Sequence, residues 1–249
     1  MKKILIVGDS YTYGTGCDDR PEYFDSKQNK WIPTAPTYPL PPPSNQCWAS
    51  LLQNALPQYE VINLGFPGHD ASTITMSALA YYNSNEIDLV IYAGTGDNRS
   101  RIATDQFNAV DLTPCSWVMS HCDLRPGVKK DYIAAQQAFM TYLYHPKVFA
   151  ENSIINIYAI HAFANAINSK ILWNLLFWDE SFKDSKLDVL KQNQFLSIIE
   201  FIRVMKDKDN GRSLNSDYLS PDGHANTIGH KAYFEEYLLS KVKNTLGIN

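Results

Sequence analysis

The sequence predicts an α/β fold, a three-layer α/β/α sandwich formed by one domain spanning 1–249. Short apolar runs, each ended by a glycine or a polar loop, alternate with stretches of helical periodicity. We expect strands at 4–7, 60–63, 88–93 and 170–178. The third run is apolar at nearly every position, as in a strand that is buried on both faces. Strands that alternate with helices predict a parallel sheet with right-handed crossovers.

The helical stretches separate these strands. Apolar residues recur there at intervals that place them on one helix face. Pro57 ends the first stretch, and the inner face of the last should carry Ile228, Tyr233, Tyr237 and Leu238. The expected helices are 47–56, 71–82, 132–144, 149–168, 187–205 and 226–243.

Two segments, at about 18–45 and 102–130, are read as insertions into this pattern. The first is rich in proline, which excludes helix and interior strand. Loops of this length in a compact domain are usually functional or disordered. Because the first insertion follows the turn that carries Ser10, we favour an active-site wall or lid, with a disordered insertion as the alternative.

Composition excludes several classes of function. The chain has 249 residues, with 22 basic and 26 acidic side chains and a net charge of −4. It has no clustered basic stripe for nucleic acid, and no apolar stretch reaches the roughly 18 residues of a membrane span. The apolar run after Lys2 and Lys3 is shorter than the roughly 7–15 residues of a signal-peptide core. We therefore expect a first β-strand there and a cytoplasmic location.

The four cysteines show no metal-binding or redox motif. Cys17, Cys47, Cys115 and Cys122 are scattered and form no C-x-x-C pair. Free buried thiols are the favoured state without a secretory signal. A disulfide between Cys115 and Cys122, or a zinc site that adds His121, remains an alternative, although a fourth zinc ligand is not evident.

Ser10 is the first candidate catalytic residue. The apolar run ends at Gly8, and Asp9 and Ser10 follow, which places the serine hydroxyl at the carboxyl end of a strand. Ligands bind at that edge of open α/β sheets. The string Gly-Asp-Ser-x-Thr-x-Gly, which ends at Gly14, resembles the first motif of the SGNH (GDSL-type) hydrolases. The resemblance implies a flavodoxin-like sheet and a nucleophilic role for Ser10.

His224 and Asp222 are the expected partners of this serine. A serine hydroxyl needs an adjacent base, usually a histidine whose other ring nitrogen is held by a carboxylate. Both residues lie in a Pro- and Gly-containing loop just before the last expected helix, where the family has its Asp and His. The family spaces them Asp-x-x-His, whereas this chain has Asp-x-His.

Acyl transfer also needs hydrogen-bond donors for the developing oxyanion. The Ser10 N–H is the first candidate. Gly65 follows the second strand in a loop that resembles the family's second motif, in which a glycine N–H donates. The loop after the third strand resembles the third motif imperfectly, with candidates at Gly96, Asp97 and Asn98. We expect Asn98 to donate, with Arg99 or Arg101 as substitutes.

The remaining polar candidates receive structural assignments. Asp9 should brace the turn before the serine by accepting N–H groups. His161 lies in the middle of an expected helix among apolar residues and should be a core histidine, and His230 lies early in the final helix and should pack or cap there. His69 follows the second strand and could line the site. His121 and His145 have no partner pattern.

Taken together, the motifs indicate a serine hydrolase that cleaves a carboxylic ester through a Ser-His-Asp triad and an acyl-enzyme. The resemblance implies that no cofactor is needed, and the substrate is expected to be a small-molecule or carbohydrate ester. An O-acyltransferase with the same triad and a degenerate, non-catalytic SGNH-like binding module are the alternatives. G-x-S-x-G and nucleotide-binding glycine motifs are absent from the sequence.

Overall fold

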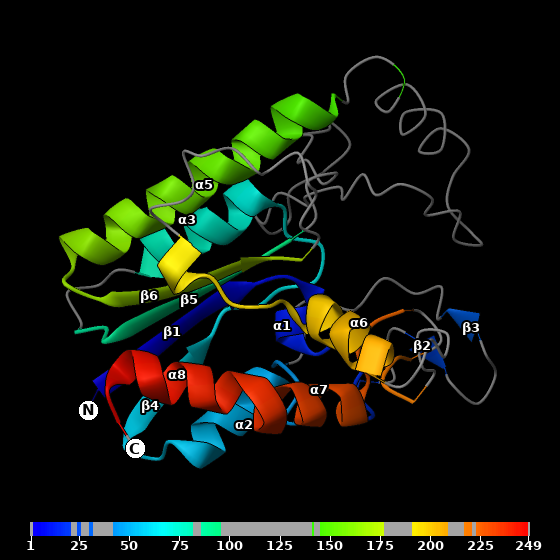
Figure 1. Ribbon diagram of the computed structural model, residues 1–249. Coiled ribbons are helices and arrows are strands. Elements are labelled where there is room, and N and C mark those ends of the chain that lie inside the picture. Colours follow the sequence, from blue (N-terminus) through cyan, green and yellow to red (C-terminus); the bar gives the residue numbers. More distant parts are fainter. Residues whose placement is uncertain are drawn as a thin grey trace, which may run out of the picture.

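A four-stranded parallel sheet forms the centre of the molecule in a computed structural model (Figure 1). Its strands are β1 (Lys2–Gly8), β4 (Tyr59–Asn63), β5 (Leu89–Gly94) and β6 (Lys170–Leu175), in the order β4-β1-β5-β6. All three pairings are parallel, as predicted. The structure describes residues 2–20, 24–25, 30–31, 42–81, 86–95, 141, 145–176, 191–208, 217–220 and 223–248.

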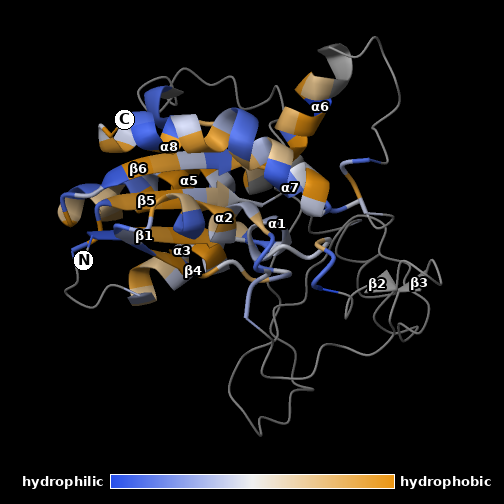
Figure 2. Cartoon of the chain, turned by 90° about the horizontal axis from the view of Figure 1, so that it is seen from below, coloured by the Kyte–Doolittle hydropathy of each residue, from blue (hydrophilic) through white to orange (hydrophobic). Residues whose placement is uncertain are grey.

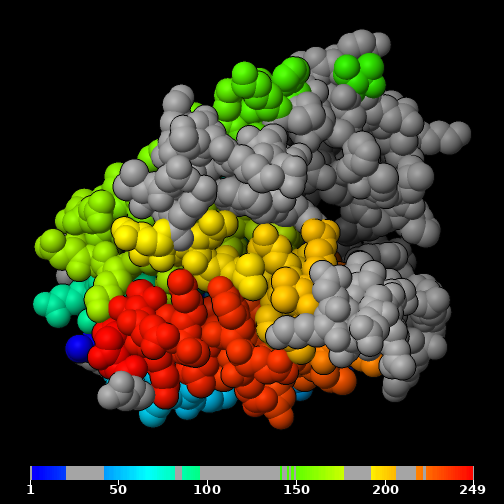
Figure 3. Space-filling view, viewed as in Figure 1, coloured from blue at the N-terminus to red at the C-terminus, as the bar shows by residue number. Residues whose placement is uncertain are grey.

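Helices cover both faces of this sheet and give the expected three layers. On one face lie α3 (Ala71–Tyr81) and α5 (Pro146–Ala166). On the other lie α2 (Trp48–Ala55), α6 (Ile198–Lys208), α7 (Thr227–Tyr233) and α8 (Leu239–Leu246). Figure 3 shows the atoms of α6 beside those of α7 on this second face.

Side-chain alternation along β1 explains the two layers. Ile4 and Ile6 are fully buried against the helices of the α2 face, whereas Leu5 and Val7 are fully buried in the α3 and α5 cluster. This period of two is that of a strand with a core on each side. In Figure 2 the strands β1, β5 and β6 are mostly apolar, whereas α8, which covers them on the near side, carries many hydrophilic residues.

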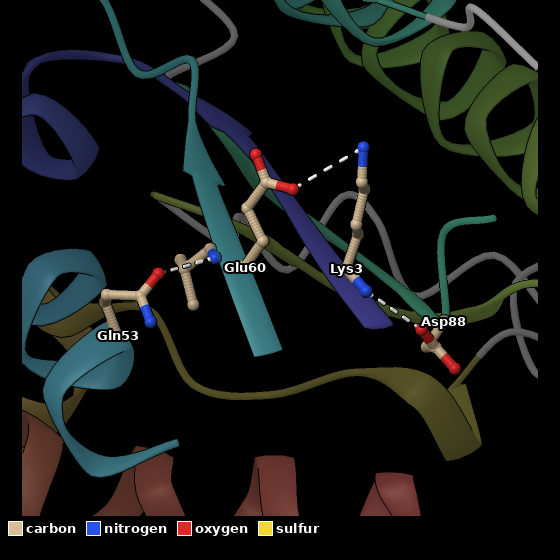
Figure 4. A network of polar contacts seen from close by, with 5 residues as sticks. Lys3, Gln53, Glu60 and Asp88 are labelled. Atoms are coloured by element: carbon tan, nitrogen blue, oxygen red, sulfur yellow. Dashed lines mark hydrogen bonds and ion pairs between the residues drawn. The ribbon is translucent and has the colours of Figure 1, made fainter. Parts of the chain in front are cut away.

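The amino ends of the strands are joined by polar contacts (Figure 4). The Lys3 ammonium lies 3.5 Å from a Glu60 carboxylate oxygen, and the Lys3 N–H donates to the Asp88 carboxylate at 2.9 Å. The Val61 N–H donates to the Gln53 side chain at 2.8 Å, which links β4 to α2. These contacts lie at the edge of the sheet opposite the one that carries Ser10. The candidate site therefore lies at the other edge, where the strands have their carboxyl ends.

The expected helix at 187–205 is wrong between 191 and 197, and its residues 187–190 lie outside the described part of the chain. A 3-10 turn, η4 (Lys191–Asn193), precedes Gln194, which forms a parallel bridge with Trp173 of β6. The helix α6 begins only at Ile198, because Ser197 and Glu200 cap its start. The Ser197 N–H donates to the Glu200 carboxylate, and the Glu200 N–H donates back to the Ser197 hydroxyl. This reciprocal pair is a capping box.

The closing helix forms as predicted, and of the four residues expected on its inner face only Ile228 is wrong, since Tyr237 also packs against the core. It comprises α7, a π-helical turn η5 (Phe234–Leu238) and α8, and Asn226 caps its start. Tyr233 and Leu238 are buried as expected, but Ile228 is 59% exposed. Burial of His230 explains the error, because two residues along a helix correspond to about 200° and point to opposite sides.

Other boundaries agree to within a few residues, and some predictions lie outside the described part. The first insertion contains a small antiparallel pair, β2 (Phe24–Asp25) with β3 (Lys30–Trp31), separate from the main sheet. The expected helix at 132–144 falls outside the described residues except for position 141, as does the expected strand beyond residue 176. Among the described residues, no helix is long and apolar enough to cross a membrane.

Candidate active site

Ser10 begins a one-turn helix at the carboxyl end of β1. This helix, α1 (Ser10–Tyr13), is capped by Asp9, whose carboxylate accepts the Tyr11 N–H at 3.0 Å. The second carboxylate oxygen of Asp9 accepts the Thr95 hydroxyl at 2.9 Å, across from the end of β5. Asp9 therefore braces the turn, as predicted. This hydrogen bond gives Thr95 a structural role, that of holding Asp9 in place, which the sequence did not predict.

Ser10 and His224 lie within hydrogen-bonding distance. The His224 Nε2 is 2.9 Å from the Ser10 Oγ, although 214 residues separate them in sequence. Ser10 is buried, with 4% of its surface exposed, and His224 is half-buried. With Nε2 unprotonated, the imidazole accepts the hydroxyl proton directly, which is the contact that a serine nucleophile requires.

A closed loop carries His224 to the serine. The His224 carbonyl accepts two hydrogen bonds from Ser220, one from its N–H at 2.8 Å and one from its hydroxyl at 3.0 Å. The Gly223 N–H donates to the Ser220 carbonyl at 2.9 Å, and a bridge pairs Leu219 with Ala225. These bonds hold a short turn, in which Gly223 has a φ of 85° that favours glycine.

Gly16 lets this loop approach the serine-bearing turn. An ideal Cβ on Gly16 would lie 2.5 Å from the Ala225 carbonyl oxygen and 2.8 Å from the His224 Cβ. Both distances are shorter than real Cβ contacts allow. A residue without a side chain is therefore needed at position 16, a role that the sequence analysis missed.

Gly65 lies against the backbone of α1. An ideal Cβ on it would lie 2.7 Å from the Tyr13 nitrogen and 2.8 Å from the Thr12 carbonyl carbon. The Gly65 N–H donates to the Asn63 side-chain oxygen at 2.8 Å, while the Asn63 amide donates to the Thr12 carbonyl at 3.0 Å. The absence of a side chain at Gly65 therefore allows the loop after β4 to pack directly against α1. A role for Gly65 as an oxyanion donor remains a prediction. In that role the Gly65 N–H would be shared between the oxyanion and the Asn63 side-chain oxygen.

The two ends of the first insertion are tied together beside this site. The Asp19 carboxylate accepts the Ser44 hydroxyl at 2.5 Å and the Asn45 N–H at 2.9 Å. The Thr227 hydroxyl, at the start of α7, accepts the Asp18 N–H at 3.1 Å and donates to the Gln46 side chain at 2.6 Å. The base of the insertion is thus attached to the segment that follows His224.

Two of the other histidines are core residues, as predicted. His230 is 1% exposed, and its Nδ1 accepts the Trp48 N–H at 3.3 Å. Burial, with a smaller contribution from the nearby His224, lowers the pKa of His230 to about 3. Burial also lowers the pKa of His161. His69 stacks on Phe66, with ring centroids 4.6 Å apart.

Cys17 and Cys47 are free and buried, which confirms the expected thiol state for these two. Burial raises the pKa of Cys17 to about 12 and raises that of Cys47. No group of three or more histidine, cysteine or acidic residues in the described part of the chain could hold a metal ion.

Several predicted site residues lie outside the described residues. They are Asp222, Gly96, Asp97, Asn98, Arg99 and Arg101, together with His121, Cys115 and Cys122 of the alternative zinc site. The structure therefore brings together Ser10 and His224, and places Asp9 and Gly65 beside them.

The fold is similar to those of solved structures of lipolytic proteins and esterases. A lipolytic protein of the G-D-S-L family from Desulfitobacterium hafniense matches at 16% identity over 94% of this chain and 95% of its own, with a TM-score of 0.50. The esterase EstA from Pseudoalteromonas sp., in a structure inhibited by monoethylphosphonate, matches at 12% identity over 98% of both chains, with a TM-score of 0.53. TesA matches at 14% identity over 98% of this chain and 99% of its own, with a TM-score of 0.50.

No protein-family model matches the sequence, and the search among curated proteins found no match. The structural similarity extends over nearly the full length of each chain, although the sequences share few identical residues. The chain therefore has the fold of the lipolytic G-D-S-L proteins, which is the SGNH hydrolase fold that the motif around Ser10 predicts.

Proposed function

We propose that this protein is a serine hydrolase that cleaves a carboxylic ester through an acyl-enzyme on Ser10. The observation that carries the proposal is the 2.9 Å contact between Ser10 Oγ and His224 Nε2, at the carboxyl edge of the sheet. Fold alone does not decide function. Here, however, the two side chains that the chemistry needs are in contact on a fold shared with esterases.

In the first half of the reaction, His224 Nε2 takes the proton from Ser10 while Oγ forms a bond to the carbonyl carbon of the ester. The tetrahedral intermediate collapses, and the alcohol leaves with the proton that His224 held. In the second half, His224 takes a proton from water, and the resulting hydroxide attacks the acyl carbon. Ser10 leaves with that proton, and the carboxylic acid is released.

The remaining roles follow the sequence motifs. Asp222 orients His224 and stabilises the imidazolium. The Ser10 N–H lies at the first position of α1, where a backbone N–H has no acceptor inside the helix, so it is available to an oxyanion. Gly65 and Asn98 supply further donors, and Gly96 and Asp97 shape the same loop. The substrate is a small-molecule or carbohydrate ester, and no cofactor takes part in these steps.

Hydrolysis of p-nitrophenyl acetate tests the proposal. Ser10→Ala removes the nucleophile, and His224→Asn removes the base while keeping a polar side chain. We expect His224→Asn to lower kcat by about 100- to 10,000-fold, the range that general base catalysis contributes, and Ser10→Ala, which removes the nucleophile, to lower it at least as far. Ser240→Ala and His145→Asn are matched controls at exposed positions on α8 and before α5, and they should retain wild-type turnover.

The same assay separates the alternatives. If the Ser10→Ala protein turns over the ester at the wild-type rate, the proposed nucleophile is wrong. If the wild type shows no turnover but is thermally stabilised by an ester ligand, the protein is a binding module. If added alcohols receive the acyl group in preference to water, the enzyme is an acyltransferase with the same two catalytic residues.

A further inference from the structure

Tyr11 contacts the loop that carries the candidate base. It directly follows Ser10 in α1, and successive helical residues point about 100° apart. Its side chain therefore leaves the helix in a different direction from that of the serine. Tyr11 is half-buried, and its backbone N–H is held by the Asp9 carboxylate at 3.0 Å. The backbone of Tyr11 is therefore held by the same Asp9 carboxylate that caps the helix bearing Ser10.

Two separate parts of the Tyr11 side chain reach the base. Its hydroxyl donates to the Gly223 carbonyl at 3.2 Å, one residue before His224. Its ring lies against the His224 imidazole, with centroids 4.8 Å apart and the planes inclined by 37°. The first contact holds the backbone of the loop, and the second limits rotation of the imidazole.

The second contact acts on the side chain of His224, whereas the hydrogen bonds described above between Ser220 and the loop act on its backbone. Those bonds run between main-chain groups and the Ser220 hydroxyl, so they place the backbone of His224 without restricting its side-chain torsions. An imidazole in reach of Ser10 must also keep Nε2 directed at Oγ. The Tyr11 ring packs against the imidazole and opposes its rotation away from that direction.

We propose that Tyr11 is a positioning residue that holds the His224 imidazole in line with the Ser10 hydroxyl. The proposal rests on the proposed function for its effect on turnover, whereas the placement of the ring can be measured without turnover. Tyr11 takes no proton and forms no bond to the substrate in this role. It acts through His224, so its loss should lower the rate of the chemical steps and leave substrate binding unchanged.

Two variants separate the two contacts. Tyr11→Phe keeps the ring and removes the hydroxyl bond to Gly223, and we expect kcat to fall by about 3- to 10-fold with KM unchanged. Tyr11→Leu removes both contacts, and we expect kcat to fall by about 10- to 100-fold, the scale of a small misplacement of a catalytic group. The rate of phosphonylation of Ser10 by a p-nitrophenyl phosphonate ester should fall in the same order.

Tyr237→Phe is the matched control. This half-buried tyrosine also uses its hydroxyl in one hydrogen bond to the backbone, as acceptor of the Leu196 N–H at 2.8 Å, away from Ser10. It should change thermal stability by a similar amount to Tyr11→Phe without changing kcat. A loss of turnover in both variants would mean that the effect of Tyr11 is merely structural.

The imidazole resonances of His224, assigned by their absence in His224→Asn, provide a readout that needs no activity. Removal of the adjacent ring in Tyr11→Leu should shift and broaden them, whereas Tyr237→Phe should not. Unchanged resonances and an unchanged kcat in Tyr11→Leu would overturn the proposal, and a change in KM alone would make Tyr11 a substrate contact instead. Absence of both turnover and phosphonylation in the wild type would refute the proposed function, and the resonances would still decide the placement by Tyr11.

Discussion

Acidification should destabilise the folded protein through His230. Burial lowers the pKa of this histidine from 6.5 to about 3. The unfolded chain therefore binds a proton near pH 6.5 that the folded protein excludes until the pH is much lower. The stability from this group is fully present above pH 6.5 and is lost as the pH falls towards 3.

The size of the effect follows from the width of this window. Each pKa unit corresponds to about 1.36 kcal/mol, so lowering the pH from 7 to about 5 should cost about 2 kcal/mol through His230 alone. At still lower pH the loss should level off at about 5 kcal/mol, as an order of magnitude, once the folded protein also binds the proton.

Urea unfolding at several pH values, for the wild type and His230→Asn, measures this contribution. Asparagine can keep an acceptor for the Trp48 N–H but has no group that titrates in this range. Other titrating groups are common to both proteins, so their contributions to the pH dependence cancel. Between pH 7 and 5 the free energy of unfolding of the wild type should fall by about 2 kcal/mol more than that of the variant. Equal pH dependences would refute the reasoning.

Three further predictions test the packing around the site. Gly16→Ala should lower kcat by roughly 10- to 100-fold in a folded protein, because its Cβ would displace His224; wild-type kcat would contradict the close approach. Iodoacetamide at pH 8 should leave Cys17 and Cys47 unmodified in the native protein and alkylate both in denaturant, since both are buried thiols with a raised pKa. Rapid labelling of the native protein, seen by peptide mass, would be incompatible with this. Ser197→Ala should lower the free energy of unfolding in urea by about 1–2 kcal/mol, because it removes the capping hydroxyl of α6; an unchanged urea midpoint would argue against the cap.

The sheet and the serine–histidine pair could be predicted because local patterns encode them. A glycine that ends an apolar run at Gly8 marks the end of β1 and places Ser10 at the edge where the other strands also end. The polar loop before α7 placed His224 near that edge, despite its shortened spacing from Asp222. The strands and the turn at Ser10 depend on periodicity and turn chemistry, which are properties of short segments, whereas the roles of Ser10 and His224 are implied by the resemblance of their loops to the SGNH motifs.

The contacts around this pair could not be predicted because they join distant segments. Nothing near Gly16 in sequence indicates that the 220–225 loop packs against it, and the residues before His224 do not indicate the Tyr11 ring. The boundary of α6 is different, since Ser197 and Glu200 form a capping box that the sequence displays. The expected helix begins at 187 because apolar residues at helical spacing extend upstream of that box.

Intact-mass and peptide analysis after treatment with a p-nitrophenyl phosphonate ester tests the central claim most directly. In the wild type, we predict one adduct, on Ser10, formed with release of p-nitrophenolate. His224→Asn should slow its formation by at least about 100-fold, the lower limit of general base catalysis. An adduct on another residue, or equal labelling of wild type and Ser10→Ala, would contradict an activated serine at the end of β1.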